Sequence, residues 1–170
     1  QKVKDKKKRG MYLSAARSQI FNAVVSTRIE NGTFDNPVAG DVMMLAGTQS
    51  VFLASEIDQT IIDRLNEKDI DITAPMWGAG ELKTENDARA IEQAVCETYS
   101  DFCQGLPKFG LKQERRKARL QISDSNLEIV DSTATLTFSL SAGSYATTVL
   151  RELLNYEDLT QRATGFQEHV

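Results

Sequence analysis

The spacing of apolar residues changes once along this sequence, and that change restricts the possible folds more than any other feature. In the first part, apolar residues recur at helical intervals, most clearly over residues 12–31. After the break at residues 105–110 they alternate with polar residues, which is the period of a half-buried strand. The sequence therefore predicts an α+β fold, with amphipathic helices and short antiparallel strands followed by a three-stranded antiparallel segment and a helix. The three strands expected there are residues 118–122, 127–130 and 134–140.

Local patterns predict the remaining elements. Residues 42–46 and 51–54 flank Gly47-Thr48-Gln49-Ser50, an arrangement typical of a β-hairpin. Thr84 followed by Asp87 resembles a capping box, which would begin a helix that ends near Cys103. The other expected elements are a helix over residues 56–67, a short strand over 69–73 and a final helix over 145–155.

Charge is distributed unevenly along the chain, although the 170 residues carry a net charge of only -4. Residues 1–10 contain six basic residues and one acid, and residues 108–119 again contain six against one. The rest of the chain has 8 basic and 22 acidic residues. Two basic blocks on an acidic body indicate a polyanionic partner. Two alternatives stay open, because the first block fits a frayed terminus and the second fits a solvated or edge strand.

Particular basic and polar residues stand out as candidate anion contacts. Alternation places Arg115, Lys117 and Arg119 on one strand face, in a row suited to phosphates. Arg17 and Arg28 fall on the apolar side of the helix over residues 12–31. A buried guanidinium needs a partner, so each of these two forms a salt bridge inside the protein or reaches an anion.

The last predicted helix offers two further candidates. Ser144 follows Gly143 at the expected helix start, where it either presents backbone amides to an anion or acts as a plain N-cap. Arg151 shares the polar face of this helix with Thr147.

Several kinds of site are excluded by composition. His169 is the only histidine, which excludes a Ser-His-Asp relay and a histidine-based metal site. Cys96 and Cys103 fit buried structural thiols better than a metal pair, and two cysteines indicate a reducing compartment. No apolar run approaches the ~20 residues of a membrane span. We therefore expect a cytoplasmic protein without membrane contact, in which these residues form no self-sufficient active site, metal site or cofactor site.

Segments near both ends of the chain resemble one enzyme family. Residues 12–22 (YLSAARSQIFN) resemble the L-S-A-x-R/Q-S-x-x-F-N segment of the TruD family of tRNA pseudouridine synthases. Residues 138–152 (FSLSAGSYATTVLRE) resemble its F-x-L-P-A-G-S-Y/F-A-T-x-V-x-R-E signature, with Ser141 in place of the usual proline. Residues 40–47 (GDVMMLAG) are similar to its G-D-x-x-x-L-A-G turn and strand. Met76-Trp77-Gly78 departs from the usual L-P-G.

The resemblance implies an RNA-modifying activity for the intact protein. Such an enzyme converts uridine, here uridine 13, to pseudouridine in tRNA without a metal or cofactor. Its nucleophile is an aspartate in a G-x-K-D-x-x-A motif well upstream of the L-S-A segment. Lys4-Asp5 offers a K-D pair, but Asp5 lies only nine residues before Ser14, so we interpret Asp5 as a chance match and not as the catalytic aspartate. The resemblance thus implies a carboxy-terminal half without the catalytic aspartate, whose partners are tRNA and the amino-terminal half of a monomeric enzyme.

The same resemblance divides the chain and assigns roles to individual residues. It implies a basic linker over 1–10, an insertion domain over 11–112, strands and a helix over 113–156 that complete a pseudouridine-synthase sheet, and a tail over 157–170. Two other functions stay open from the residues alone: a non-catalytic RNA-binding module, and an interaction domain for an acidic protein. The residues expected to contact RNA are Arg17, Asn22, Arg115, Lys117, Arg119, Ser144 and Arg151.

Overall fold

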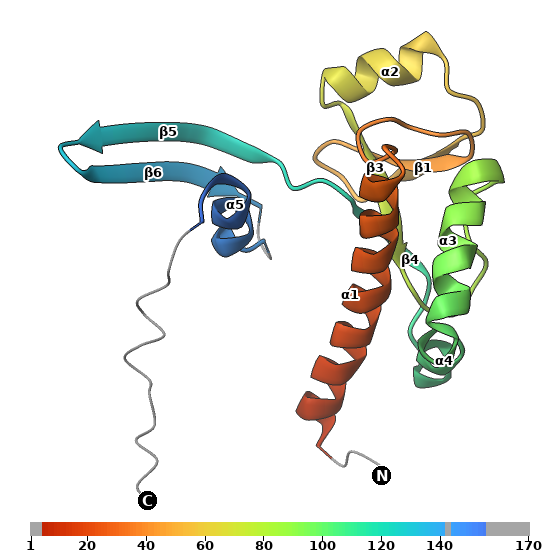
Figure 1. Cartoon of the computed structure of the whole chain (residues 1–170). Coiled ribbons are helices and arrows are strands. Elements are labelled where there is room, and N and C mark those ends of the chain that lie inside the picture. The colour runs from red at the N-terminus through yellow and green to blue at the C-terminus, as the bar shows by residue number, and fades with distance from the viewer. Residues whose placement is uncertain (1–4, 142–143, 156–170) are drawn as a thin grey trace, which may run out of the picture. The chain divides into compact units, whose positions relative to one another are not determined.

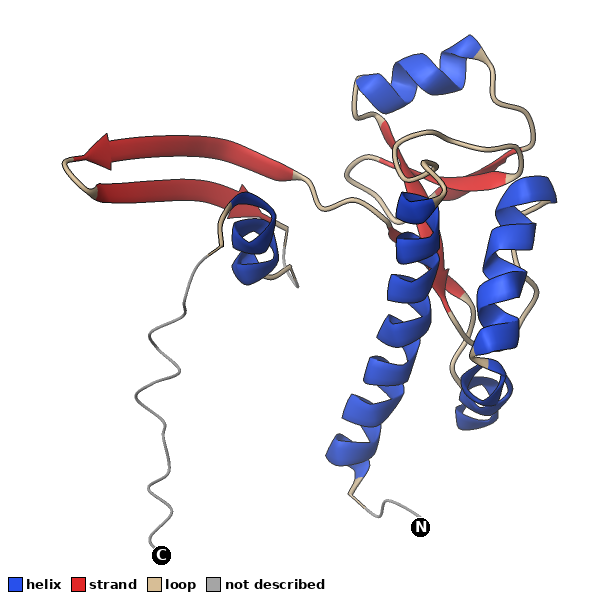
Figure 2. Cartoon of the chain, viewed as in Figure 1, coloured by secondary structure: helices blue, strands red, loops and turns tan. Residues whose placement is uncertain are grey.

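A computed structural model describes residues 5–141 and 144–155 of the chain (Figure 1). The chain divides into two compact units, residues 1–119 and residues 120–170. Helices and antiparallel strands occur in both units, which confirms the α+β class (Figure 2).

The first unit begins with the long helix α1, Lys6–Glu30. This helix starts earlier than the apolar pattern predicts, because Asp5 caps it: Asp5 Oδ1 accepts hydrogen bonds from the backbone N–H groups of Lys7 and Lys8, at 2.8 and 3.2 Å. Residues 6–10 are therefore helical rather than part of a linker.

A four-stranded antiparallel sheet forms the centre of the first unit. Its strands are β1 (Asp41–Leu45), β2 (Val51–Ala54), β3 (Ile70–Met76) and β4 (Glu114–Lys117), in the order β2-β1-β3-β4. The β1–β2 hairpin is as predicted. β3 runs past the expected end at Thr73 because β4 pairs with it as far as Met76.

Two apolar clusters hold this unit together. The first lies where α1 packs on β3 and on α3 (Asn86–Thr98), and Figure 1 shows these two helices side by side. The second joins α2 (Gln59–Asn66) to β1 and β3. The buried residues of the first cluster are Ile20, Phe21, Val24, Ala74, Trp77, Val95, Cys103 and Leu106, and those of the second are Met43, Ala54, Leu65, Ile70 and Ile72.

The expected capping box at Thr84 is wrong. Glu85 is the N-cap of α3, and Thr84 is buried, with its hydroxyl donating to Glu92 Oε2 at 3.0 Å. The helix that was expected to continue to Cys103 is interrupted at Tyr99, whose φ of -107° and ψ of 38° are not helical. A short helix α4 (Ser100–Gly105) and a 3₁₀ turn η1 (Leu106–Phe109) follow.

The second unit contains the hairpin β5 (Ile122–Val130) and β6 (Thr133–Leu140), followed by helix α5 (Ala146–Leu153). The described residues of this unit contain two strands, whereas the sequence predicted three in this region. The turn predicted over residues 123–126 lies inside β5, where the register shifts and Asp124 adopts a φ of +50°. The first predicted strand, residues 118–122, is wrong: only Ile122 lies in a strand, β5, and the strand that precedes this segment is β4, which pairs with β3 in the first unit. The expected tail over 157–170 lies outside the described residues.

Candidate nucleic-acid interface

Strand β4 divides its basic residues between two faces. Arg115 lies opposite Pro75 and Lys117 lies opposite Thr73, so these two share a face, as the alternation predicts. Arg116, opposite Ala74, points to the other face and is exposed. Arg119 lies just after the strand. Its guanidinium donates hydrogen bonds to Asp71, on the same face as Arg115 and Lys117.

The shared face is covered by acidic and hydroxyl groups of the protein itself. Arg115 Nε donates to Thr73 Oγ1 at 2.9 Å, and its Nη2 donates to the Thr73 carbonyl at 2.8 Å. Its Nη1 lies 2.8 Å from Glu92 Oε1, and both side chains of this pair are only 4% exposed. All three guanidinium nitrogens are thus bonded within the protein. The face predicted from alternation exists, but Arg115 uses it to join β4 to β3 and α3.

Burial also changes the acidity of Glu92. The loss of water raises the pKa of Glu92 above its ordinary value, while the charge and hydrogen bonds of Arg115 and the hydroxyl of Thr84 act in the opposite direction.

Lys117 and Arg119 share one buried carboxylate. Lys117 Nζ lies 3.0 Å from Asp71 Oδ2, and Arg119 Nη2 lies 2.9 Å from Asp71 Oδ1. The Asp71 side chain is fully buried, whereas those of the two cations are 26% and 24% exposed. Arg119 also lies 3.6 Å from Asp35, whose side chain is 69% exposed. Both basic residues are therefore held by acids and keep only part of their surface for a solvent anion.

Both arginines on the apolar side of α1 form salt bridges inside the protein. Arg28 makes a bidentate pair with Asp41 at 2.7 and 2.9 Å, and both side chains are buried. Arg17 Nη2 lies 2.9 Å from Glu114 Oε2, 2.7 Å from the carbonyl of Met76 and 2.9 Å from that of Lys112. Of the two alternatives left open by the sequence, the structure shows the internal salt bridge in each case. Arg17 joins α1 to the end of β3 and the start of β4.

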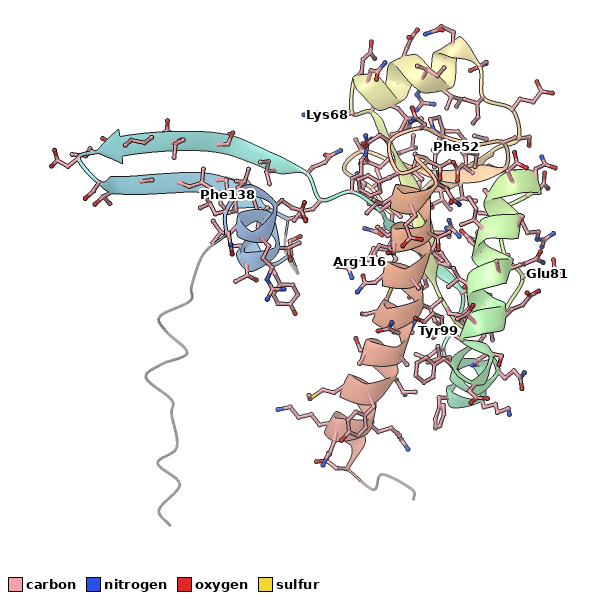
Figure 3. All side chains as sticks on the ribbon, viewed as in Figure 1. Phe52, Lys68, Glu81, Tyr99, Arg116 and Phe138 are labelled. Carbon is pink, nitrogen blue, oxygen red and sulfur yellow. The ribbon has the colours of Figure 1, made fainter. Side chains whose placement is uncertain are left out.

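Several exposed cations of the first unit lie instead along α1 and beside it. The guanidinium of Arg116 is 5.5 Å from the centre of the Phe21 ring, a cation–π contact on α1, and Figure 3 shows it beside that helix. The side chain of Lys112 is exposed near Arg17, which bonds its carbonyl. Lys6 to Arg9 are all exposed. The exposure of Arg116 could have been inferred from the alternation that places Arg115 and Lys117 on the opposite face.

The first turn of α1 is electrostatically unfavourable in isolation. It contains four consecutive cations and no acid, at the end of the helix where the backbone dipole is positive. Each such cation costs roughly 0.3–1 kcal/mol at an exposed site. None of these four side chains has an ion pair within the residues that the structure describes. The carboxylate of Asp5, which caps the helix, is one negative charge beside these four positive charges.

Asn22 lies away from these cations. It lines an open groove of about 430 Å³ between α1 and α3, together with Gln19, Glu30, Thr98 and other side chains. Polar and apolar groups both line the groove, and the hydroxyl of Tyr99 at its wall accepts a hydrogen bond from Gln19 Nε2 at 3.2 Å.

The remaining site residues belong to the second unit. Tyr145, not Ser144, is the N-cap of α5, and the N–H of Ser144 donates to the carbonyl of Ser141 at 3.1 Å. Ser144 is therefore not the plain N-cap that one alternative expected, and its own amide already has a partner. Arg151 is exposed on α5.

Metal and thiol chemistry find no support in the part of the chain that the structure describes. There, no three potential metal ligands lie close enough to hold an ion. Cys96 and Cys103 are free thiols: Cys103 is buried in the α1 cluster, as predicted, whereas Cys96 is only partly buried against it. Burial, with Cys96 nearby, raises the pKa of Cys103 and so disfavours the reactive thiolate. His169 lies outside the described residues. Across residues 5–141 and 144–155, no helix has the length and apolar character to cross a membrane.

This is an α+β protein in which the protein's own acids neutralise the basic face of the sheet. Its exposed cations on one helix suit a polyanion such as nucleic acid. The chain belongs to the TruD family, tRNA pseudouridine synthase D, whose family model matches residues 2–153.

Comparisons with individual proteins agree. A tRNA pseudouridine synthase D of Colwellia psychrerythraea is 57% identical in an alignment of 172 positions that covers 95% of this chain and 47% of the relative. The protein of the same name from Shewanella oneidensis is 44% identical, over 94% of this chain and 43% of the relative. The crystal structure of a putative tRNA pseudouridine synthase D from Methanosarcina mazei matches with a TM-score of 0.66 and 26% identity, over 80% of this chain and 36% of that one. The chain spans about half the length of the curated relatives it matches.

Proposed function

We propose that this chain is part of a tRNA pseudouridine synthase that converts a uridine, uridine 13, to pseudouridine in tRNA. The observation that carries the proposal is the family match over residues 2–153. The curated relatives that match along nearly all of this chain bear the name tRNA pseudouridine synthase D.

In the proposed reaction, the carboxylate of an aspartate attacks an extruded uridine and the glycosidic bond breaks. The base then rotates, and a carbon–carbon bond to the sugar forms as the carboxylate is released. The ring carbon that forms this bond loses a proton and the freed ring nitrogen gains one, so that no atom is gained or lost overall. This chemistry needs no metal or cofactor. It needs an unpaired carboxylate, a pocket for the flipped base and a positive surface that holds the RNA.

We propose that the nucleophile lies outside this chain. Asp5, the aspartate that follows a lysine near the start, is occupied as the N-cap of α1. Asp41 and Asp71 are buried and bonded to arginine or lysine. These contacts favour a structural role for the three carboxylates, and leave RNA binding as the contribution of this chain.

The amino-terminal half of the same protein is the proposed second partner. The β5–β6 hairpin supports this, because every residue of β5 is exposed and several are apolar. A two-stranded hairpin is marginally stable alone, so we expect it to extend a sheet of the amino-terminal half. Under the same proposal, residues 11–112 form the insertion domain and residues 113–156 the returning segment, although β4 pairs with the strands of the first unit.

A complementation assay tests the function. The 170-residue chain, a separately expressed amino-terminal half and their mixture would each be incubated with a tRNA transcript, and pseudouridine would be measured by mass spectrometry after chemical derivatisation. We expect product from the mixture alone. Product from the 170-residue chain alone would contradict the placement of the nucleophile, and binding without product from the mixture would favour a non-catalytic RNA-binding module.

A further inference from the structure

Some of the exposed cations of the first unit lie in a row along α1, whereas others, such as Lys68 and Lys83, lie elsewhere. Lys6 and Arg9 lie at helical spacing from Leu13 and Arg17, so all four project from one side of the helix. Leu13 and Arg17 are partly buried against the body of the unit, but Lys6 and Arg9 are exposed. The first turns of α1 therefore extend this side beyond the sheet, as Figure 1 shows.

Contacts with α1 bring the side chain of one further exposed cation, Arg116, and the backbone of another, Lys112, to this helix. Arg116 contacts Phe21, and the carbonyl of Lys112 accepts from Arg17, one turn closer to the start of the helix. From Phe21 to Lys6 the helix rises about 22 Å, at ~1.5 Å per residue. Unlike Arg115, Lys117 and Arg119, none of these four exposed cations forms an ion pair within the described residues; the nearby acids are Asp5, which caps α1, and Glu114, which is bonded to Arg17.

We infer that Lys6, Arg9, Lys112 and Arg116 form a phosphate-binding row that contacts the RNA backbone; this inference rests on the proposed function, because it takes RNA as the partner. In this inference, the main electrostatic contact between the first unit and RNA is this row and not the face that carries Arg115, Lys117 and Arg119. Charge complementarity favours this occupant, since phosphates are anionic and these four exposed cations form no ion pair within the described residues; the attraction is local, because the whole chain has a net charge of -4. Contacts to phosphates position an RNA without reading its sequence, which suits a surface of flexible cationic side chains.

Salt-dependent binding tests the row. The affinity of the 170-residue chain for a labelled tRNA transcript would be measured by fluorescence anisotropy from ~50 to ~200 mM salt. The variants are Lys6→Gln with Arg9→Gln, and Lys112→Gln with Arg116→Gln. Each pair is expected to weaken binding about tenfold at the lowest salt and to reduce the log–log salt slope by about 1.4, since a phosphate contact on a single strand contributes ~0.7.

Two control variants separate charge from other effects. Lys68→Gln with Lys83→Gln removes two exposed cations elsewhere in the same unit, and is expected to change the affinity less than about twofold. Lys112→Arg with Arg116→Lys keeps both charges and is expected to keep the slope. Melting curves of every sample check the fold, and the Lys6/Arg9 pair lies on exposed turns where the fold is least affected.

The outcomes distinguish this inference from the proposed function. If both row variants bind like the Lys68/Lys83 control while the unmodified chain binds tRNA, the row is overturned and the proposed function stands. If the charge-keeping variant loses as much slope as the charge-removing one, the contact is not electrostatic and the row is overturned. If the unmodified chain does not bind tRNA at low salt, the inference and the RNA-binding role of this chain fail together.

Discussion

Glu92 on α3 and Arg115 on β4 form a salt bridge of 2.8 Å in which both side chains are 4% exposed. The pair connects an edge strand to a helix that is 23 residues earlier in the sequence. It also explains why a basic strand that resembles a phosphate-binding surface in the sequence is an internal connection in the folded chain.

Removing Arg115 is expected to destabilise the first unit strongly. Arg115→Ala leaves the buried carboxylate of Glu92 without its cation, which typically costs about 3–5 kcal/mol. Urea unfolding monitored by circular dichroism measures the change. The neighbouring variant Arg116→Ala is the control, because Arg116 is exposed, and it should cost less than about 1 kcal/mol. Equal losses from the two variants would contradict the assignment of the faces.

The stability contributed by residue 92 is expected to depend on pH. Because burial raises the pKa of Glu92 above 4.5, the folded chain holds this proton more tightly than the unfolded chain. The stabilising contribution of Glu92 is therefore fully present below pH 4.5. It is lost as the pH rises through the raised pKa of the folded state. The free energy of unfolding of the unmodified chain relative to Glu92→Gln should decrease between pH 4 and pH 7. A difference that stays constant or increases over this range would contradict the raised pKa.

Arg17→Ala is expected to lower the free energy of unfolding by about 1–3 kcal/mol, since it removes the donor for two carbonyls and one carboxylate. Arg9→Ala, on the exposed part of the same helix, should change it by less than about 0.5 kcal/mol. The same two variants also test the prediction that Arg17 contacts RNA. It would gain support if Arg17→Ala reduced tRNA binding at an unchanged melting temperature.

Gly40 is expected to tolerate no side chain. Its φ is +83°, and a Cβ atom there would overlap the backbone of Glu85. Gly47 has a similar φ of +69° but open space around it. Gly47→Ala should therefore cost about 1–2 kcal/mol, from the left-handed conformation alone, and Gly40→Ala distinctly more. Thermal melting of the two variants compares them directly, and equal costs would exclude the overlap with Glu85.

Under the proposed function, the apolar residues of the hairpin are expected to matter only when the amino-terminal half of the enzyme is present. Leu127 and Ile129 share one face of β5 and are 59% and 67% exposed. Ile129→Lys should leave the melting of the 170-residue chain nearly unchanged but reduce the pseudouridine yield of the full-length enzyme at least tenfold. Glu128→Lys, on the other face, is the control. If Ile129→Lys leaves the full-length enzyme fully active, the hairpin does not pack through this face.

Much of the fold was predictable because the signals are local. The spacing of Ile20 and Val24 indicates the helix that packs on β3, and Gly47 with its neighbours indicates the first hairpin. The failures share a different cause. Thr84 has the sequence context of an N-cap, but its hydroxyl bonds the buried Glu92, and residues 114–117 become a strand because β3 offers an unpaired edge. Both depend on groups that are distant in sequence.

The sequence by itself determined the α+β class, the family and the two basic blocks, because periodicity, motifs and charge can be recognised without knowing which residues meet. Only the tertiary structure decided which cations are neutralised. Asp71 and Glu92 lie more than twenty residues from the basic residues they bind, and a buried charge must be paired because its hydration has been removed. Arg115 thus serves the fold, while Arg116, one residue further, faces the solvent.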